Sequence, residues 1–213
     1  MKMNLPNKLT VLRLILVPVI LVVMLLPYRW YYNLIAAAIF GAASLTDMLD
    51  GKIARKYGLV TDFGKFLDPL ADKFMVLAAI FGVLFRNWFG YGAFDKEPNP
   101  YIFWTFMTML IITVFRELAV ASIRLITAKK SGIVVAADML GKIKTVVQIV
   151  CILLALLEPV LYEFITWAWY IPNTVYFTYY ILTLIAAGLA VIFTLWSGIN
   201  YIKNYWKYMD PEK

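Results

Sequence analysis

Residues 47–72 read DMLDGKIARKYGLVTDFGKFLDPLAD, and this stretch places four aspartates between two long apolar segments. Asp47 and Asp50 are three residues apart, and Asp68 and Asp72 are four apart, so each pair shares one face of a helix. A short connection predicts that the two helices are antiparallel neighbours, which brings the pairs together. The sequence therefore predicts four clustered carboxylates at one end of a helical hairpin.

Such a cluster needs positive charge, because an aspartate near the centre of a membrane helix costs about 2.5–3.5 kcal/mol to insert. The chain has no histidine and a single cysteine, Cys151, so a bound metal must be held mainly by oxygen. Oxygen ligands favour Mg²⁺, Mn²⁺ or Ca²⁺. The alternative is that the aspartates cap helices or pair with nearby basic residues, namely Lys52, Arg55, Lys65 and Lys73.

The composition of the whole chain is that of a membrane protein. Of its 213 residues, 63% are hydrophobic and 15% are charged, and the mean hydropathy is +0.78. Soluble domains are about 45–50% apolar and about 25% charged, so a soluble globule and a disordered chain are both excluded. The net charge of +7 does not indicate a nucleic-acid partner, since basic residues also gather where a membrane protein meets the cytoplasm.

Apolar runs of about 20 residues, the length that spans a bilayer, occur six times in the chain. The sequence therefore predicts an all-α, polytopic membrane protein in which residues 1–213 form one membrane domain. Arg13 interrupts the first run and further runs follow, so this run is not expected to be a cleavable signal peptide. The predicted spans are 9–27, 32–50, 64–86, 101–127, 139–158 and 175–200.

Basic residues predict the orientation of these spans. Six spans put both termini on one side, and that side with its adjoining helix ends receives 17 of the 20 Lys and Arg residues, leaving Arg29, Arg86 and Lys96 opposite. The positive-inside rule makes the richer side cytoplasmic. We therefore expect both termini, and an active site at the aspartates, to face the cytoplasm from the cell (inner or plasma) membrane.

The residues between the aspartate pairs suggest a bound phosphate compound. Gly51 removes a side chain where a ligand approaches the backbone, and Gly64 does so one turn before Asp68. Arg55 lies one turn beyond Gly51 and carries a guanidinium suited to phosphate. Helix packing explains the glycines equally well, and an anchor at the membrane surface explains Arg55.

These residues also form a recognisable pattern. Their spacing resembles the signature of the CDP-alcohol phosphotransferases, a family of six-helix membrane enzymes that are usually homodimers. The likeness extends along most of the chain, to residues 4–13, 66–73, 116–120 and 140–145, and is greatest to the bacterial phosphatidylglycerophosphate synthase branch. All eight fixed positions are filled: Asp47, Asp50, Gly51, Ala54, Arg55, Gly64, Asp68 and Asp72.

The resemblance implies a reaction and roles for the residues in it. The reaction is transfer of a phosphatidyl group from CDP-diacylglycerol to sn-glycerol 3-phosphate, which gives phosphatidylglycerophosphate and CMP. Asp72 matches the family's general base, and two divalent ions, Mg²⁺ or Mn²⁺, are expected between the aspartates. The resemblance assigns metal binding to Asp47, Asp50, Asp68 and Asp72, and CDP-diacylglycerol binding to Gly51, Arg55 and Thr61.

An anionic acceptor requires a second, basic site. The candidate residues for the acceptor phosphate are Arg116, Arg124, Lys142 and Lys144, which lie towards the cytoplasmic ends of the fourth and fifth spans. Glu117 is an alternative partner for Arg116, and Lys144 could instead reach the lipid headgroups. Contact with anionic membrane lipid is expected at Lys129, Lys130, Lys203 and Lys207.

Three polar residues near the start of the chain, Asn7, Thr10 and Arg13, either border the site or cap the first helix at the membrane surface. Two other functions remain open: the same transfer to another alcohol, such as inositol phosphate or serine, and divalent-cation transport. A transporter should carry acids along several spans and often has inverted repeats, whereas these acids cluster at one end. A structural scaffold is a third alternative.

Overall fold

The described part of the protein, in the computed structural model, consists of six α-helices. The structure describes residues 4–58, 61–88, 99–131, 139–169 and 180–206, apart from the side chains of residues 48–56, 65, 128–131, 166 and 169. No strand occurs among these residues. The helices are α1 (Leu5–Leu25), α2 (Trp30–Lys56), α3 (Asp62–Trp88), α4 (Pro100–Ser131), α5 (Met139–Trp169) and α6 (Ile181–Tyr205).

Each helix overlaps one of the six predicted spans, so the all-helical fold class is confirmed. Among the residues that the structure describes, four segments are long and apolar enough to cross a membrane: α1, residues Pro100–Thr127, residues Met139–Ile165, and α6. The helices α2 and α3 are as long, but polar residues interrupt them, among them Asn33 in α2 and Lys73 in α3. The two helices that carry the aspartate pairs are thus the least suited to lipid.

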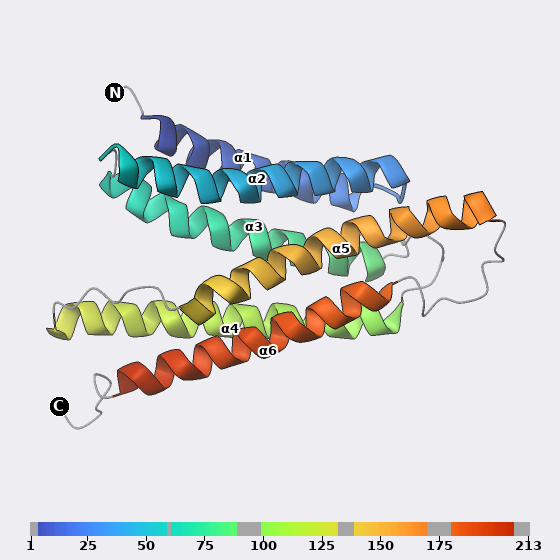
Figure 1. The fold of residues 1–213 in the computed structure, drawn as a ribbon. Helices are drawn as coiled ribbons and strands as arrows, with labels where there is room; N and C mark the ends of the chain where they lie inside the picture. Colours follow the sequence, from blue (N-terminus) through green and yellow to red (C-terminus); the bar gives the residue numbers. More distant parts are fainter. Residues whose placement is uncertain (1–3, 59–60, 89–98, 132–138, 170–179, 207–213) are drawn as a thin grey trace.

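The helices alternate in direction along the bundle, so that α1 begins and α6 ends at the same end (Figure 1). Helix α1 packs against both α2 and α3, and α6 packs against both α4 and α5. Contacts of α5 with α2 and of α3 with α4 join these two groups. The sequence predicts that α2 and α3 are packed neighbours, but within the described residues both pack against α1, α2 also against α5 and α3 also against α4, and not extensively against each other.

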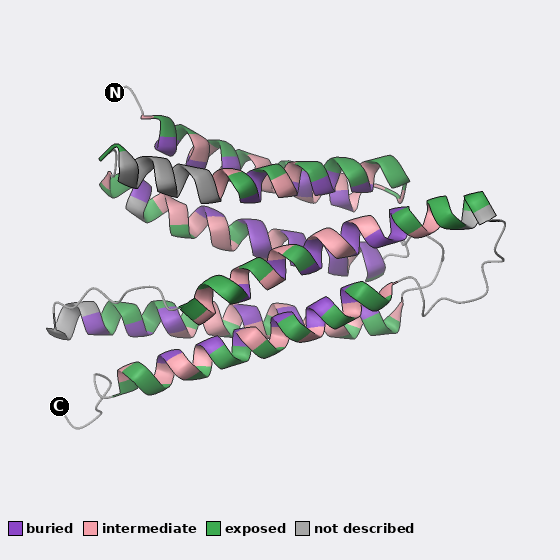
Figure 2. Cartoon of the chain, viewed as in Figure 1, coloured by how far each residue is buried: buried purple, intermediate pink, exposed green. Residues whose placement is uncertain are grey.

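A continuous apolar core lies between the helices. It includes Phe40 of α2, Ile80 of α3, Phe106 of α4 and Ile152 of α5, all fully buried. Large apolar side chains also cover the outer faces, and buried and exposed residues alternate around each helix (Figure 2). Because an apolar exterior around an apolar core is typical of a protein solvated by lipid, this pattern supports a membrane location.

A buried carboxylate on α5 fixes the start of α6. Glu158 accepts hydrogen bonds from the backbone N–H of Leu182 and of Thr183, at 2.9 and 2.8 Å, and from the Thr183 hydroxyl at 2.6 Å. These are N–H groups of the first helical turn, which have no partner within their own helix. The fully buried Cys151 lies two turns earlier on the same helix.

The end of the bundle at which α6 begins has further polar residues, but none of the predicted site residues lies there. A cavity there is lined by Tyr28, Arg86 and Asn87 together with apolar side chains. Arg86 donates a hydrogen bond to Asn33 and lies over the Tyr28 ring, 5.1 Å from its centre. Burial, with a hydrogen bond to Glu163, raises the pKa of Tyr28, so this phenol stays protonated.

Candidate functional site

Two of the predicted carboxylates meet at a cation from a third helix. The Nη1 atom of Arg13, on α1, lies 2.7 Å from an oxygen of Asp47 on α2 and 2.7 Å from an oxygen of Asp72 on α3. The two carboxylate oxygens are therefore no farther apart than twice that distance. The Arg13 side chain is 1% exposed, whereas Asp47 and Asp72 are 34% and 39% exposed. The carboxylates thus remain open to a ligand on the side away from Arg13.

Helix α1 also holds a third predicted carboxylate. The hydroxyl of Thr10 contacts an oxygen of Asp68 at 2.5 Å and the backbone oxygen of Pro6 at 3.1 Å. Thr10 is buried and Asp68 is half-buried. We call Asp47, Asp68 and Asp72, with Arg13 and Thr10, the acidic cluster. Three helices build it, with α1 in contact with all three carboxylates.

The start of α3 is fixed against α1 next to this cluster. Thr61 donates to the side-chain oxygen of Asn7 and accepts from the backbone N–H of Gly64, both at 3.0 Å, as an N-cap does. A Cβ on Gly64 would lie 2.9 Å from that Asn7 oxygen, closer than carbon and oxygen approach. The glycine is therefore needed for close packing of α1, and the Thr61 hydroxyl has a structural partner in addition to its predicted ligand role.

The remaining residues of the predicted donor and metal sites lie outside the described side chains. Asp50, Gly51 and Arg55 belong to the last turns of α2, whose backbone is helical through Lys56. Their predicted roles in binding metal and CDP-diacylglycerol therefore stay predictions.

A second polar cluster surrounds one carboxylate. An oxygen of Glu117 on α4 lies 2.7 Å from Arg116 Nη1 and 2.6 Å from Lys144 Nζ on α5. Its other oxygen lies 3.5 Å from Lys73 Nζ on α3. We call Lys73, Arg116, Glu117 and Lys144 the basic cluster, in which one anion faces three cations.

The surrounding helices leave space for the Arg116 side chain and contact the second terminal nitrogen of its guanidinium. Its Nη2 atom donates to the hydroxyl of Ser197 on α6 at 2.7 Å. A Cβ on Gly141 would lie 3.4 Å from the guanidinium, and one on Gly198 would lie 3.3 Å from the Arg116 side chain. Both glycines, Gly141 on α5 and Gly198 on α6, leave space for the Arg116 side chain. The basic cluster and its surroundings are therefore built by α3, α4, α5 and α6.

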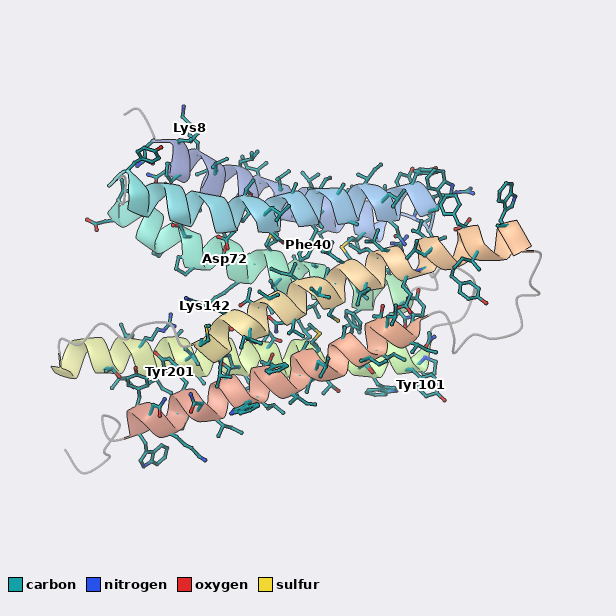
Figure 3. All side chains as sticks on the ribbon, viewed as in Figure 1. Lys8, Phe40, Asp72, Tyr101, Lys142 and Tyr201 are labelled. Atoms are coloured by element: carbon teal, nitrogen blue, oxygen red, sulfur yellow. The ribbon has the colours of Figure 1, made fainter. Side chains whose placement is uncertain are left out.

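Only two of the four predicted acceptor residues belong to the basic cluster. Arg124 is exposed, donates to the Tyr201 hydroxyl at 3.1 Å, and lies over that ring. Lys142 is exposed at the start of α5, in the same half of the molecule as Asp72 and away from Tyr101 (Figure 3). The alternative that Glu117 partners Arg116 is confirmed, but Glu117 is shared with two more cations.

The oxygen donors of the acidic cluster fit a divalent metal ion in chemistry. Carboxylates are the ligands that Mg²⁺ prefers, and Asp47 and Asp72 already converge on a single cationic atom. Among the residues whose side chains are described, no three such ligands lie close enough together to hold a metal ion. Asp68 is held by Thr10, and the Asp50 side chain is not among those described.

Several residues in or next to these clusters were either predicted only as one of two alternatives, as Asn7, Thr10 and Arg13 were, or given no role in the site. Asn7, Thr10 and Arg13 had a signal, because polar residues spaced by three in an apolar run mark a buried helix face. Lys73 and Glu117 are charges within apolar segments, which is a signal for a partner in the bundle. Ser197 had no signal, since a lone serine is common in membrane helices.

Comparison with known proteins places the chain among enzymes of phospholipid synthesis. Residues 3–199 match the sequence model of the family described as CDP-alcohol phosphatidyltransferase. The chain is 38% identical over 215 residues to the CDP-diacylglycerol–glycerol-3-phosphate 3-phosphatidyltransferase of Bacillus subtilis (strain 168), covering 96% of each. It is 32% identical to the enzyme of the same name from Pseudomonas fluorescens, over 99% of this chain and 94% of that one.

A third relative matches a shorter part. The chain is 38% identical over 151 residues to the probable phosphatidylglycerophosphate synthase of Mycobacterium tuberculosis (strain ATCC 25618 / H37Rv), over 70% of this chain and 64% of that one. The matches to the Bacillus and Pseudomonas proteins are nearly full-length. The protein therefore belongs to the CDP-alcohol phosphatidyltransferase family.

Proposed function

We propose that this protein transfers a phosphatidyl group from CDP-diacylglycerol to sn-glycerol 3-phosphate, releasing CMP. The observation that carries the proposal is the presence of two clusters with opposite charge imbalance. Two carboxylates share one guanidinium in the acidic cluster, and three cations share one carboxylate in the basic cluster. The first suits a cation and the second suits an anionic substrate. The names of the relatives support this choice of substrates.

The acceptor phosphate would bind at the basic cluster. Arg116 offers a planar guanidinium, and Lys144 adds an ammonium group, both of which bind phosphate oxygens well. Lys73 joins this set from α3, directly after Asp72 in sequence. In this proposal, a phosphate held by these residues would leave the hydroxyl end of a small acceptor free to reach Asp72. Arg124 and Lys142 are proposed as outer contacts that attract the anion.

Asp72 would act as the general base. It takes the proton from the acceptor hydroxyl while that oxygen forms a bond to the phosphatidyl phosphorus. The bond from this phosphorus to the CMP oxygen breaks, and CMP leaves with the electron pair. The exposed side of Asp72 gives the hydroxyl access to the carboxylate. The position of Asp72 matters as much as its basicity, because a carboxylate next to cations is a weak base.

A divalent cofactor, Mg²⁺ or Mn²⁺, would be held by the aspartates as two ions. The residues proposed as ligands are Asp47, Asp50, Asp68 and Asp72. When bound, the ions neutralise the phosphate charge of the donor and the charge that develops on the leaving CMP. Gly51, Arg55 and Thr61 are proposed to bind the donor. Their place at the cytoplasmic end would let the lipid tails of CDP-diacylglycerol stay in the membrane.

The proposed membrane arrangement has six transmembrane helices and both termini in the cytoplasm. Four segments meet the requirement of length and hydropathy on their own, and α2 and α3 would cross with their charges turned inward onto α1, α4 and α5. The excess of basic residues at one end supports the cytoplasmic orientation. We also propose a homodimer that contacts anionic lipid through basic residues at the membrane surface.

The reaction is tested with purified protein in detergent, CDP-diacylglycerol and Mg²⁺, with one alcohol added at a time. CMP release should require sn-glycerol 3-phosphate. Serine and water carry no phosphate, and each should give less than about a hundredth of that rate, since a basic cluster left without its phosphate loses several charge-assisted hydrogen bonds. Inositol phosphate can place a phosphate in the basic cluster, so it is the comparison acceptor that tests selection of the rest of the alcohol. Release with serine alone would contradict the proposed acceptor.

A further inference from the structure

A stripe of buried polar residues on α1 has no role in the reaction as proposed. Asn7, Thr10 and Arg13 follow one another at intervals of three, which places them on one face of the helix. They are 7%, 1% and 1% exposed, in a helix that is otherwise mostly apolar. Burying three polar side chains in such a helix is unfavourable unless each finds a partner.

Each residue of this stripe contacts a different part of the acidic cluster or its support. Arg13 bonds Asp47 and Asp72, which come from two different helices. One turn earlier, Thr10 bonds Asp68. One further turn back, Asn7 accepts from Thr61, directly before α3 begins. The stripe thus contacts all three described carboxylates and the cap of the helix that carries two of them.

The contacts do more than join helices, because they fix the direction of carboxylate oxygens. A carboxylate that binds metal works best when its orientation is held by a hydrogen bond from an outer partner, and loss of such a partner commonly weakens metal binding by about 10- to 100-fold. The Thr10 hydroxyl is an informative case, since it is neutral and its effect on Asp68 is one of direction and not of charge. Arg13 adds charge balance for two carboxylates that would otherwise repel each other.

We infer that the face of α1 formed by Asn7, Thr10 and Arg13 is a positioning element that orients the carboxylates of Asp47, Asp68 and Asp72 and so sets the affinity for the divalent ion. This inference rests on the proposed function, because it takes the aspartates to be metal ligands. In this inference the three residues of the face are positioning residues and not ligands of substrate or metal. They act through the carboxylates.

The test measures Mn²⁺ binding directly, by the loss of the free-ion electron paramagnetic resonance signal on titration of purified protein. Thr10→Val removes the hydroxyl and keeps the shape, and we expect the dissociation constant for Mn²⁺ to rise by about 10-fold. At saturating Mn²⁺ the rate of CMP release should return to within about threefold of the original, because the chemical groups are intact. Thr10→Ser, which keeps the hydroxyl, should bind Mn²⁺ like the unmodified protein.

The matched control is Thr108→Val. Thr108 lies on α4 and its hydroxyl donates to the backbone oxygen of Trp104, within its own helix. It should leave Mn²⁺ affinity unchanged. If Thr10→Val does not yield folded protein, Thr10→Ala takes its place with the same expectation.

The outcomes separate this inference from the proposed function. If the unmodified protein binds Mn²⁺, Asp72→Asn weakens that binding and Thr10→Val does not, the positioning role is wrong and the metal site stands. If the unmodified protein binds no Mn²⁺, the metal site itself is wrong and the inference fails with it. A rise in the dissociation constant for Thr10→Val, absent from Thr10→Ser and Thr108→Val, supports the inference.

Discussion

The acidic and basic clusters lie in adjacent parts of one bundle and have reversed charge ratios. In the acidic cluster a single guanidinium joins carboxylates from two helices, and in the basic cluster a single carboxylate joins cations from three. Each cluster has enough opposite charge to exist inside a membrane protein, but not enough to be neutral. The difference leaves a net negative charge in one cluster and a net positive charge in the other, and the proposed function assigns a cation to the first and an anion to the second.

The largest expected effect is a loss in the rate of CMP release when the proposed general base is replaced. Asp72→Asn should lower the rate of CMP release by about 10²–10⁴-fold, because the acceptor hydroxyl then lacks a base. The measurement is CMP release at saturating donor, acceptor and Mg²⁺. Asp62→Asn is the matched control, an exposed aspartate in the first turn of the same helix, and should keep the full rate. A rate within tenfold for Asp72→Asn would contradict the proposed base.

The next effect tests whether the basic cluster depends on its only described anion. Glu117→Gln leaves three cations close together, and we expect a loss of about 3 kcal/mol in the free energy of unfolding, as when one partner of a buried ion pair is removed. Inorganic phosphate should restore more stability to this variant than to the unmodified protein, because it replaces the missing negative charge. Thermal unfolding in detergent, with and without phosphate, measures both effects.

The control for this variant is Glu163→Gln at the other end of the bundle. Glu163 accepts a hydrogen bond from Tyr28 and belongs to neither cluster. Its substitution should not create a response to phosphate. Equal stabilisation of both variants by phosphate would show that the response does not arise at the basic cluster.

A smaller effect distinguishes the ligands of the two clusters. Lys144→Met removes one charged donor to the acceptor phosphate, so the KM for sn-glycerol 3-phosphate should rise by about 10- to 100-fold while the Mg²⁺ requirement stays the same. Asp47→Asn should do the reverse, raising the Mg²⁺ requirement and leaving this KM nearly unchanged. Steady-state kinetics over both concentrations checks the pair. If both variants changed both parameters alike, the clusters would not be separate sites.

The smallest effect concerns Arg124, which the structure leaves outside the basic cluster. Arg124→Gln should raise the KM for sn-glycerol 3-phosphate by less than about threefold, since this exposed side chain offers only a screened, long-range attraction. The same kinetic assay at low and high salt measures it. A loss as large as that of Lys144→Met would place Arg124 in direct contact with the phosphate.

Much of the fold could be predicted from the sequence because a helix that crosses a bilayer needs about 20 consecutive, mostly apolar residues. Apolar runs of sufficient length predicted all six described helices, including α2 and α3, whose apolar runs are interrupted by more polar residues. The aspartate pairs could be predicted because spacing within one helix fixes the shared face. The ends were less predictable: α2 and α4 continue for several residues beyond the apolar runs, to Lys56 and Ser131.

Contacts between helices could not be predicted from spacing. Arg13 lies 34 and 59 positions from its two aspartates, and nothing in a single sequence says that α1 packs against both α2 and α3. For the same reason, the sequence offered Glu117 as a neighbour of Arg116 but not of Lys73 on another helix. The sequence predicts which residues share a face of one helix. Contacts between residues on different helices can be identified only when the packing of the helices is known.

The position of Arg13 on the first helix has a consequence for how the protein is made. Chains are synthesised from the N-terminus, so α1 reaches the membrane before α2 and α3. The two acid-bearing helices are also the two that are not apolar enough to enter lipid readily by themselves. If α2 and α3 cross the membrane as proposed, a cation that matches Asp47 and Asp72 is already in place on α1 when they arrive, and the order of synthesis would ease the insertion of residues on which the proposed reaction depends.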